Sequence, residues 1–475
     1  SYALLSDVQQ RFFDSLSVFA GSFDFNAVLA VVPDSEAASD EYDVIDQLED
    51  LVEKSMVTAT ATDGMTRYRV LETLRQYGAE RLDLRSQTGL VRDRHLAHYV
   101  VTAGRLHDEW FSRDQPRADQ NFEQDWDNLR AAHRHALAVS RPADAQSIVI
   151  STAWHALERL RNEHRAWTAD SLALGLQWSE THPTTFAVAA AWDYFAADLE
   201  EAVTHAQQGA HAHAEHPEVG GCLAWLLYAL MGADLVDSAG EVIPALSAQL
   251  DATIPLDVEF MALMALTDAS LSEASDMHDT AFATLCRTIA SPVALARAAQ
   301  LRANRLLSTL PPEVEQALES FRRALAAGGS HAPSERLWSL GGVATCLVMM
   351  DDPSAPDALQ SAIEANYDAR LWFGLDLALG TAASYLLRRV PRAAATILGY
   401  VLPRPPSAIG ATTAARREAV AEVSAWREGP RWLEDGGTME RHDIVAYALD
   451  ALRASGESPM AAAETSAQGR RPATG

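Results

Sequence analysis

The feature that most constrains the fold of this chain is a set of alanines that recur at intervals of 36 to 42 residues. Each alanine comes early in an amphipathic segment that follows a polar or proline-containing break. In the clearest copy, 315–326, Ala317, Phe321 and Ala324 share one helical face. Small residues at a helix crossing let neighbours approach closely, so the period predicts stacked two-helix units, an α-solenoid. The alanines are Ala202, Ala239, Ala281, Ala317, Ala358 and Ala394.

A second interpretation keeps these helices but treats the spacing as accidental, in an alanine-rich bundle. Under the first interpretation the chain is mainly α, with tetratricopeptide-like helical repeats over 141–454. Two long helices between 91 and 139, around a polar loop at 112–118, fill a connecting segment at 85–140. Residues 455–475 are low-complexity Ala, Ser, Pro and Gly, which predicts a disordered tail.

Residues 1–84 predict a winged helix, a small domain of three helices and a β-hairpin. Ser6 and Gln9 form a capping-box pattern at the start of the first helix. Asp63-Gly64 is a strong two-residue hairpin signal between two alternating segments. The predicted helices are 7–19, 26–32, 42–54 and 72–82, the strands are 56–60 and 66–70, and the apolar stripe of the third helix is Val44, Ile45, Leu48, Leu51 and Val52.

The charge of the chain argues against binding to nucleic acid or to an anionic membrane. Acidic residues outnumber basic ones by 65 to 38, and the net charge is -27. The helix at 42–54, which would enter a DNA groove, carries five carboxylates and one base, Lys54. We therefore predict that the winged helix packs within the protein, and DNA binding by this domain is the alternative. The five acids are Asp43, Asp46, Glu49, Asp50 and Glu53.

The sequence also indicates where the protein resides. No run of about 18 apolar residues and no signal-peptide pattern is present, so we predict a cytoplasmic protein. Cys222, Cys286 and Cys346 lie far apart in apolar context, which predicts buried thiols in a reducing compartment. Because Ser1 precedes a helix signal directly, we expect the chain to be a piece of a longer protein.

Patterns for catalysis are weak, so we predict a chain with no enzymatic activity, no cofactor and no bound metal. No phosphate-binding Gly-x-x-x-x-Gly-Lys-Ser/Thr sequence occurs. The apolar run 347–350 before Asp351-Asp352 imitates a magnesium-binding strand, but a buried repeat helix explains it better. Among the histidines, His213 and His216 have the spacing of metal ligands on a helix, although a solvated face also explains them. Metal-dependent hydrolysis through this pair is the enzymatic alternative.

Several segments taken together carry a family resemblance: 17–23, 48–57 (LEDLVEKSMV), 67–82 (RYRVLETLRQYGAERL), 94–95, 127–132 (DNLRAA) and 392–400 (RAAATILGY). They resemble the region after the nucleotide-binding domain in bacterial signal-transduction ATPases of the STAND (NB-ARC-like) class. That class includes large LuxR-type transcriptional regulators. The resemblance covers most of the chain and is strongest before residue 135. It implies an ATPase domain upstream in the same polypeptide.

The resemblance also implies functional residues. By position, Leu71-Glu72-Thr73 matches a Met-His-Asp signature that contacts bound ADP in that class. Glu72 replaces the histidine, and a carboxylate cannot donate to a phosphate, so we expect Glu72 to pair with an arginine, either Arg75 or one in the ATPase domain. The signature residues serve either as a relay between domains or only to maintain the fold. They are Arg67, Tyr68, Glu72, Arg75, Tyr77, Arg94, His95 and Asn128.

We therefore predict a non-catalytic sensor and scaffold of a transcriptional regulator. The repeats would bind a protein, a peptide or a small ligand on a concave surface, and the winged helix would relay its presence. Candidate surface residues are basic or aromatic, although burial alone explains tryptophan and tyrosine at such positions more often. They are Arg336, Trp338, Trp372 and Tyr385.

Overall fold

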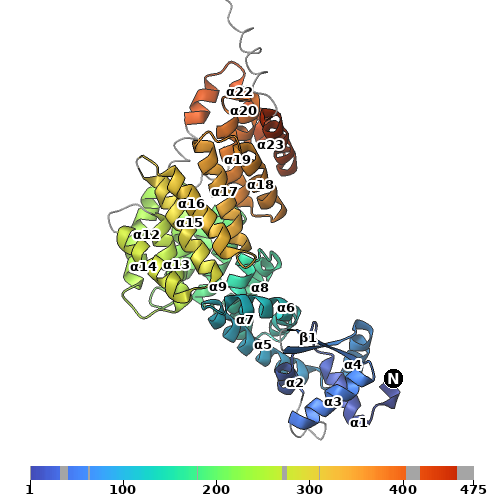
Figure 1. The fold of residues 1–475 in the computed structure, drawn as a ribbon. Helices are drawn as coiled ribbons and strands as arrows, with labels where there is room; N and C mark the ends of the chain where they lie inside the picture. The colour runs from blue at the N-terminus through green and yellow to red at the C-terminus, as the bar shows by residue number, and fades with distance from the viewer. Residues whose placement is uncertain are drawn as a thin grey trace, which may run out of the picture. The chain divides into compact units, whose positions relative to one another are not determined.

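The computed structural model describes residues 2–32, 41–62, 65–178, 180–269, 275–309, 311–402 and 418–456, and this part of the chain is mainly helical (Figure 1). The chain divides into two compact units. The first comprises Ser1–Ala156 and Asn162–Thr185, and the second comprises Leu157–Arg161 and Phe186–Gly475. Within the described residues, no helix is long and apolar enough to span a lipid bilayer.

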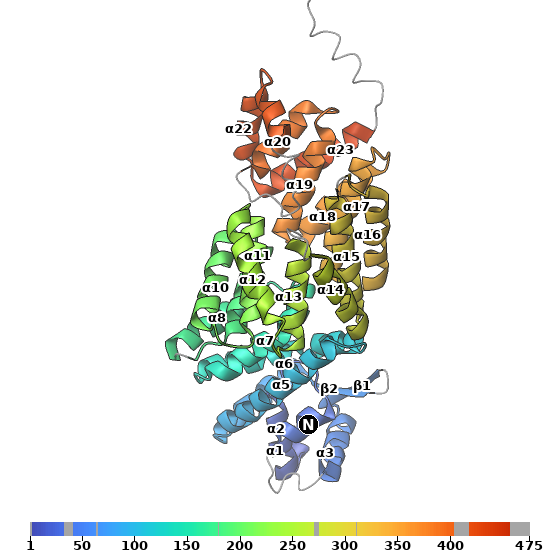
Figure 2. The same cartoon turned by 90° about the vertical axis from the view of Figure 1, so that its left-hand side faces the viewer.

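The first unit begins with the predicted winged helix (Figure 2). The Ser6 hydroxyl accepts a hydrogen bond from the Gln9 amide at 3.2 Å, and the Gln9 side chain accepts one from the Ser6 amide at 3.1 Å. The strands pair antiparallel, and the predicted turn residues 63–64 lie outside the described part. The elements are η1 (Tyr2–Leu4), α1 (Asp7–Leu16), α2 (Phe25–Val31), α3 (Glu41–Glu53), β1 (Val57–Thr62), β2 (Met65–Val70) and α4 (Glu72–Leu84).

The predicted stripe of α3 is wrong at one residue. Val44, Leu48 and Leu51 are buried, as their spacing of four and three residues requires for a single helical face. Ile45 lies one residue, about 100° of helix rotation, away from Val44 and is 38% exposed. The helix is therefore more narrowly amphipathic than its composition suggests, and its outer face is mostly acidic.

Four further helices belong to the first unit. The loop between the first two is shorter than predicted: the sequence places it at 112–118, but α6 already begins at Gln115. Pro116 is tolerated there because the first amides of a helix have no partner within the helix. The helices are α5 (Thr88–Trp110), α6 (Gln115–Ala138), α7 (Pro142–Glu158) and α8 (Glu163–Trp178).

The second unit contains a series of helices, α10 to α20, in which each contacts the next along the chain. The odd-numbered helices α11, α13, α15, α17 and α19 also contact one another in turn. We call this row the odd-helix layer; nearest-neighbour stacking of this kind is the packing of an α-solenoid. The helices are α9 (Pro183–Phe195), α10 (Leu199–Ala212), α11 (Val219–Gly232), α12 (Val236–Gln249), α13 (Leu256–Ala269), α14 (Ser275–Ile289), α15 (Pro292–Ser308), α16 (Val314–Gly328), α17 (Pro333–Met349), α18 (Ala355–Asp368), α19 (Trp372–Leu386), α20 (Pro391–Val401), α22 (Gly429–Gly437) and α23 (Arg441–Gly456).

The recurring alanines fall on six successive even-numbered helices, α10 to α20, so the predicted two-helix period is confirmed. Their burial is less uniform than the period suggests. Ala202, Ala239, Ala317 and Ala394 are fully buried at helix contacts, whereas Ala281 is exposed on α14. Ala281 is the seventh residue of its helix, whereas each of the other five alanines is the fourth residue of its helix.

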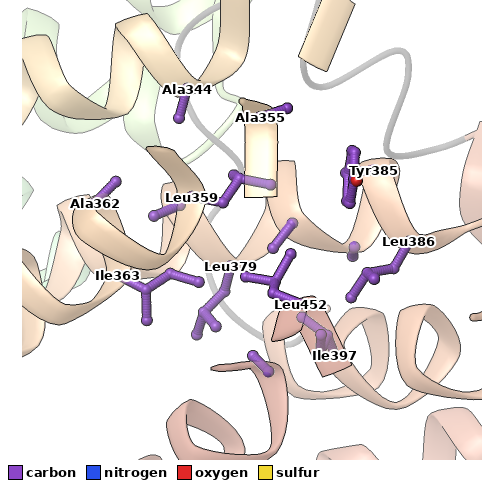
Figure 3. Close-up of a cluster of buried hydrophobic side chains, with 14 of the residues drawn as sticks. Ala344, Ala355, Leu359, Ala362, Ile363, Leu379, Tyr385, Leu386, Ile397 and Leu452 are labelled. Atoms are coloured by element: carbon purple, nitrogen blue, oxygen red, sulfur yellow. The ribbon is translucent and has the colours of Figure 1, made fainter. Parts of the chain in front are cut away.

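The C-terminal helices share a core of aliphatic side chains (Figure 3). Leu359 and Ile363 of α18, Leu379 of α19 and Leu452 of α23 are all fully buried. The run 347–350 that imitates a magnesium-binding strand spans the end of α17. Of the predicted disordered tail, residues 457–475 lie outside the described residues.

Candidate functional site at the joint between the winged helix and α6

Asn128 of α6 holds the backbone that follows α1 of the winged helix. Its Oδ1 accepts hydrogen bonds from the amides of Ala20 at 2.9 Å and Gly21 at 3.3 Å. Its Nδ2 donates to the Ser22 carbonyl at 2.8 Å. Asn128 is fully buried, and a Cβ atom added at Gly21 would lie 3.1 Å from the Asp127 Cβ, so the two segments pack closely.

Arg67 of β2 makes the second connection to α6. Its guanidinium donates to the Asp125 carboxylate at 2.6 Å, to the Ser22 carbonyl at 2.8 Å and to the Gln124 carbonyl at 3.3 Å. Burial raises the pKa of Asp125, and the charge of Arg67 opposes that shift. The two side chains are 12% and 9% exposed, so the pair is largely shielded from water. Removing one partner would leave the other as a buried, unpaired charge.

Two residues of α5 complete this set. Arg94 donates to the carbonyl of Val32, just after α2, at 2.9 Å. His95 is 2% exposed, and its ring packs near those of Phe19 and Tyr99. Burial lowers the pKa of His95 to about 3, so its ring is uncharged at neutral pH. We call the contacts of Arg67, Arg94, His95 and Asn128 the joint.

The other signature residues lie within the winged helix. Tyr68 exchanges backbone hydrogen bonds with Phe23, at 2.8 and 2.9 Å, and the Tyr77 ring meets the Tyr2 ring edge-on. Glu72 pairs with Arg75 at 2.8 Å, which is the local alternative of the two expected from the sequence. Hydrogen bonds from Arg75, and then from Gln76, lower the pKa of Glu72 to about 2.

A pocket of about 440 Å3 opens beside the joint. The winged helix contributes Arg75 of α4 together with the end of α1. From α5 and α6 come two further arginines, Arg92 and Arg134, and two histidines, His95 and His135. The lining includes no aspartate or glutamate, in a chain that has 65 of them. Sequence reasoning missed Arg92 and Arg134, because their meeting depends on how α5 and α6 pack.

The four predicted ligand-surface residues lie on α17 and α19, in different local surroundings. Trp338 of α17 packs near Phe195 and Phe373, in an aromatic group contributed by α9, α11, α17 and α19. The Trp372 ring lies under the Arg441 guanidinium at 4.2 Å, and the Tyr385 ring under that of Arg389 at 4.1 Å. Arg336 is exposed on α17.

The odd-helix layer also holds buried charges that the sequence reading missed. Arg297 of α15 forms an ion pair with Glu335 of α17. Glu158 accepts hydrogen bonds from the amides of Ser334 at 2.7 Å and Glu335 at 3.3 Å. The available signal was that Arg297, Gln300 and Asn304 recur at helical spacing along α15.

The residues weighed for metal binding and thiol chemistry have other environments. Among the described residues, no group of three His, Cys, Asp or Glu side chains is arranged to hold a metal ion. The rings of His213 and His216 lie 6.3 Å apart at the end of α10. All three cysteines are buried, as predicted, and burial raises the pKa of each thiol to about 12.

Three comparisons with known proteins give a family, relatives and a solved structure. Residues 5–83 match the winged helix-turn-helix domain family. A protein of Mycobacterium tuberculosis (strain ATCC 25618 / H37Rv), "Putative HTH-type transcriptional regulator Rv0890c", is 41% identical over 132 residues, or 28% of this chain and 14% of that protein. "Uncharacterized protein Rv0894" of the same strain is 34% identical over 113 residues, or 22% of this chain and 28% of that protein.

One solved structure matches along most of the chain. It is a Signal Transduction ATPase with Numerous Domains (STAND) protein with a tetratricopeptide repeat sensor, PH0952 from Pyrococcus horikoshii. It covers 96% of this chain and 66% of its own chain, with a TM-score of 0.48 and 12% identity. Over part of its length the chain is thus similar to a protein named as a putative transcriptional regulator, and its residues 5–83 form a winged helix-turn-helix domain.

Proposed function

We propose that this chain is the regulatory and sensor part of a larger transcriptional regulator, in which the helical repeats bind an effector and the joint relays its presence to the winged helix. The observation that carries the proposal is Asn128, whose side chain forms hydrogen bonds with three backbone groups of the winged helix. These contacts fix the position of the winged helix on α6. A displacement of α6 would therefore have to move the winged helix or break buried hydrogen bonds.

In this proposal the chain itself performs no catalysis. Nucleotide turnover would belong to an ATPase domain upstream in the same polypeptide, whose activity the winged helix controls. An effector shifts such a switch only by its difference in affinity for the two states. Glu72 supports a relay that works without direct phosphate contact, since it is engaged by Arg75 and Gln76 of its own helix.

The odd-helix layer is the proposed effector surface. It combines Trp338, Phe373 and other aromatic side chains with the Arg297–Glu335 ion pair. The Tyr228 hydroxyl, which is buried beside them, has no hydrogen-bond partner among the described residues. Aromatic anchors with a few polar groups are typical of ligand sites.

The relay is tested in the longer polypeptide by measuring nucleotide turnover with and without the Asn128→Ala substitution. We expect turnover to change several-fold, because the joint no longer fixes the winged helix. Asn26→Ala, at an exposed position of α2, is the matched control and should leave turnover unchanged. Equal turnover in wild type and Asn128→Ala would contradict the relay.

A second candidate function is DNA binding by the winged helix, which the family match and the names of the relatives favour. The outer face of α3 argues against it, because Glu41, Asp46 and Glu49 are exposed there. The one lysine of the chain, Lys54, lies 3.5 Å from the Asp50 carboxylate. A mobility-shift titration with duplex DNA separates the two functions. A shift that weakens with added salt and is lost in Lys54→Gln would establish DNA binding.

A further inference from the structure

The pocket beside the joint concentrates positive charge in an acidic chain. Three separate helices each contribute one arginine to its lining: Arg75 from α4, Arg92 from α5 and Arg134 from α6. Exposed like charges repel one another, and an acidic chain offers many carboxylates that would neutralise them. Glu72 neutralises Arg75, but no carboxylate lines the pocket beside Arg92 and Arg134, so an anion that neutralises these two would come from outside.

The polar side chains that line the pocket differ in whether they already have hydrogen-bond or ion-pair partners within the protein. Arg92 and Arg134 form no hydrogen bond or ion pair with any described residue. The Nε2 atom of His95 is buried without a hydrogen-bond partner in the same part of the chain, although His95 is only 2% exposed. Arg75 is held by Glu72 and by the Ser17 carbonyl, and His135 by Asp93 at 2.7 Å. Two guanidiniums are therefore available to a ligand, whereas the Nε2 atom of His95 is shielded by burial.

We infer that this pocket binds a phosphate group, either as free phosphate or as the monoester of a small organic molecule. The planar fork of a guanidinium matches phosphate oxygens in pairs, and a phosphate monoester carries about −1.5 to −2 charges at neutral pH, enough for two or three arginines. A carboxylate carries only one. Val18, Ala79 and Leu82 give the pocket an apolar wall, and about 440 Å3 leaves room for an organic part.

The assignment of the site rests on the pocket alone, whereas its regulatory consequence rests on the proposed function. Such a ligand would touch α4, α5 and α6 together. It would thereby hold the winged helix on the helices that carry Asn128. Bound phosphate should then stabilise the joint and resist its opening.

The site is tested by calorimetric titration of this chain with phenyl phosphate, inorganic phosphate and benzoate. We expect phenyl phosphate to bind at least about tenfold more weakly to the double variant Arg92→Gln/Arg134→Gln than to wild type. Both arginines are exposed and unpaired, so the variant should retain its fold, which circular dichroism checks. Arg113→Gln, at another exposed arginine outside the pocket, is the matched control and should bind as wild type does.

Each outcome decides a separate point. Equal affinity for phenyl phosphate and inorganic phosphate identifies free phosphate as the source, and preference for phenyl phosphate identifies an ester. Benzoate binding as tightly as phenyl phosphate, absence of phosphate binding, or an equal loss in Arg113→Gln would overturn the inference. So would binding of an oligonucleotide without binding of phenyl phosphate. Phosphate binding with unchanged nucleotide turnover in Asn128→Ala would retain the site and reject the relay.

Discussion

At the scale of single residues, a few buried polar side chains decide where the winged helix lies. Hydrophobic contacts are non-directional, whereas Asn128 and Arg67 each require particular backbone groups at hydrogen-bond distance. Both residues come from segments that carry the family resemblance. The structure favours a role for these two in joining elements, while Tyr68 and Tyr77 serve the fold of the winged helix itself.

Removing the Asn128 side chain should destabilise the first unit by about 2–3 kcal/mol, because buried backbone groups of residues 20–22 lose their partners. The measurement is the free energy of unfolding of Asn128→Ala in urea. The exposed Asn26→Ala variant should unfold within about 0.5 kcal/mol of wild type. A loss no larger than that of the control would show that water replaces these hydrogen bonds at little cost.

The Arg67–Asp125 pair should show strong coupling in a double-mutant cycle. Arg67→Met alone should cost about 3–5 kcal/mol of unfolding free energy, because it leaves the Asp125 carboxylate buried and unpaired. Adding Asp125→Asn should recover part of that loss, since the amide carries no charge. Additive effects of the two substitutions, measured by denaturant unfolding, would mean that solvent already screens the pair.

At the scale of elements, small residues set how closely the repeat helices approach. Ala202 is the fourth residue of α10 and is fully buried, while Ala281 is the seventh residue of α14 and is exposed. Alanines of one recurring series thus lie in two different environments, one buried at a helix contact and one exposed. The alanine period therefore predicts the number and order of helix pairs better than it predicts the packing of each pair.

A larger side chain should distinguish these two environments. Ala202→Leu should cost about 1–3 kcal/mol, because the added atoms have no space at the α10 contacts. Ala281→Leu makes the same chemical change at an exposed position and should change stability by less than about 0.5 kcal/mol. Thermal unfolding of both variants provides the comparison, and equal destabilisation would refute the assigned packing.

At the scale of the whole molecule, burial keeps histidines of the first unit and glutamates of the second unit uncharged over part of the pH range. In the first unit, burial lowers the pKa of His95 and His164 to about 3 and that of His133 to about 4. In the second, burial and the neighbouring carboxylate raise the pKa of Glu158 to about 8, and burial raises that of Glu335 to about 7. Each shift keeps the group uncharged in the folded state over part of the pH range.

The stabilities of the two units should therefore depend on pH in opposite directions. The neutral histidines contribute to the free energy of unfolding of the first unit above their unfolded-state pKa of about 6.5. This contribution is lost as pH falls toward their folded-state pKa values of about 4 and about 3. The neutral glutamates contribute to the free energy of unfolding of the second unit below their unfolded-state pKa of about 4.5. This contribution is lost as pH rises through their folded-state pKa values of about 7 and about 8. Calorimetry at several pH values should show one unit weakening in acid and the other in base.

Glu158→Gln should flatten the alkaline part of this dependence. The amide oxygen still accepts hydrogen bonds from the Ser334 and Glu335 amides, but it carries no charge to bury. The melting temperature of the second unit should then fall by several degrees less between about pH 6 and 8.5 than in wild type. An unchanged pH dependence would show that Glu158 is not the group that titrates.

The sequence by itself determined the elements and their order. The capping box at Ser6 and the alternating strands are local patterns that depend on residues within one turn or one hairpin, and the alanine period repeats one such local helix pattern along the chain. Boundaries failed where local signals compete, as at Pro116, which is compatible with either a loop or a helix start. The winged helix and the helical repeats were therefore predictable from the residues alone.

Only the tertiary structure decided which side chains meet. Asn128 lies more than 100 residues from the loop it binds, and Arg75, Arg92 and Arg134 reach one pocket from three helices. Glu158 and Glu335 likewise meet across 177 residues of chain. No local pattern encodes such pairs, because the packing angle and register of whole helices set the distance between side chains on different elements.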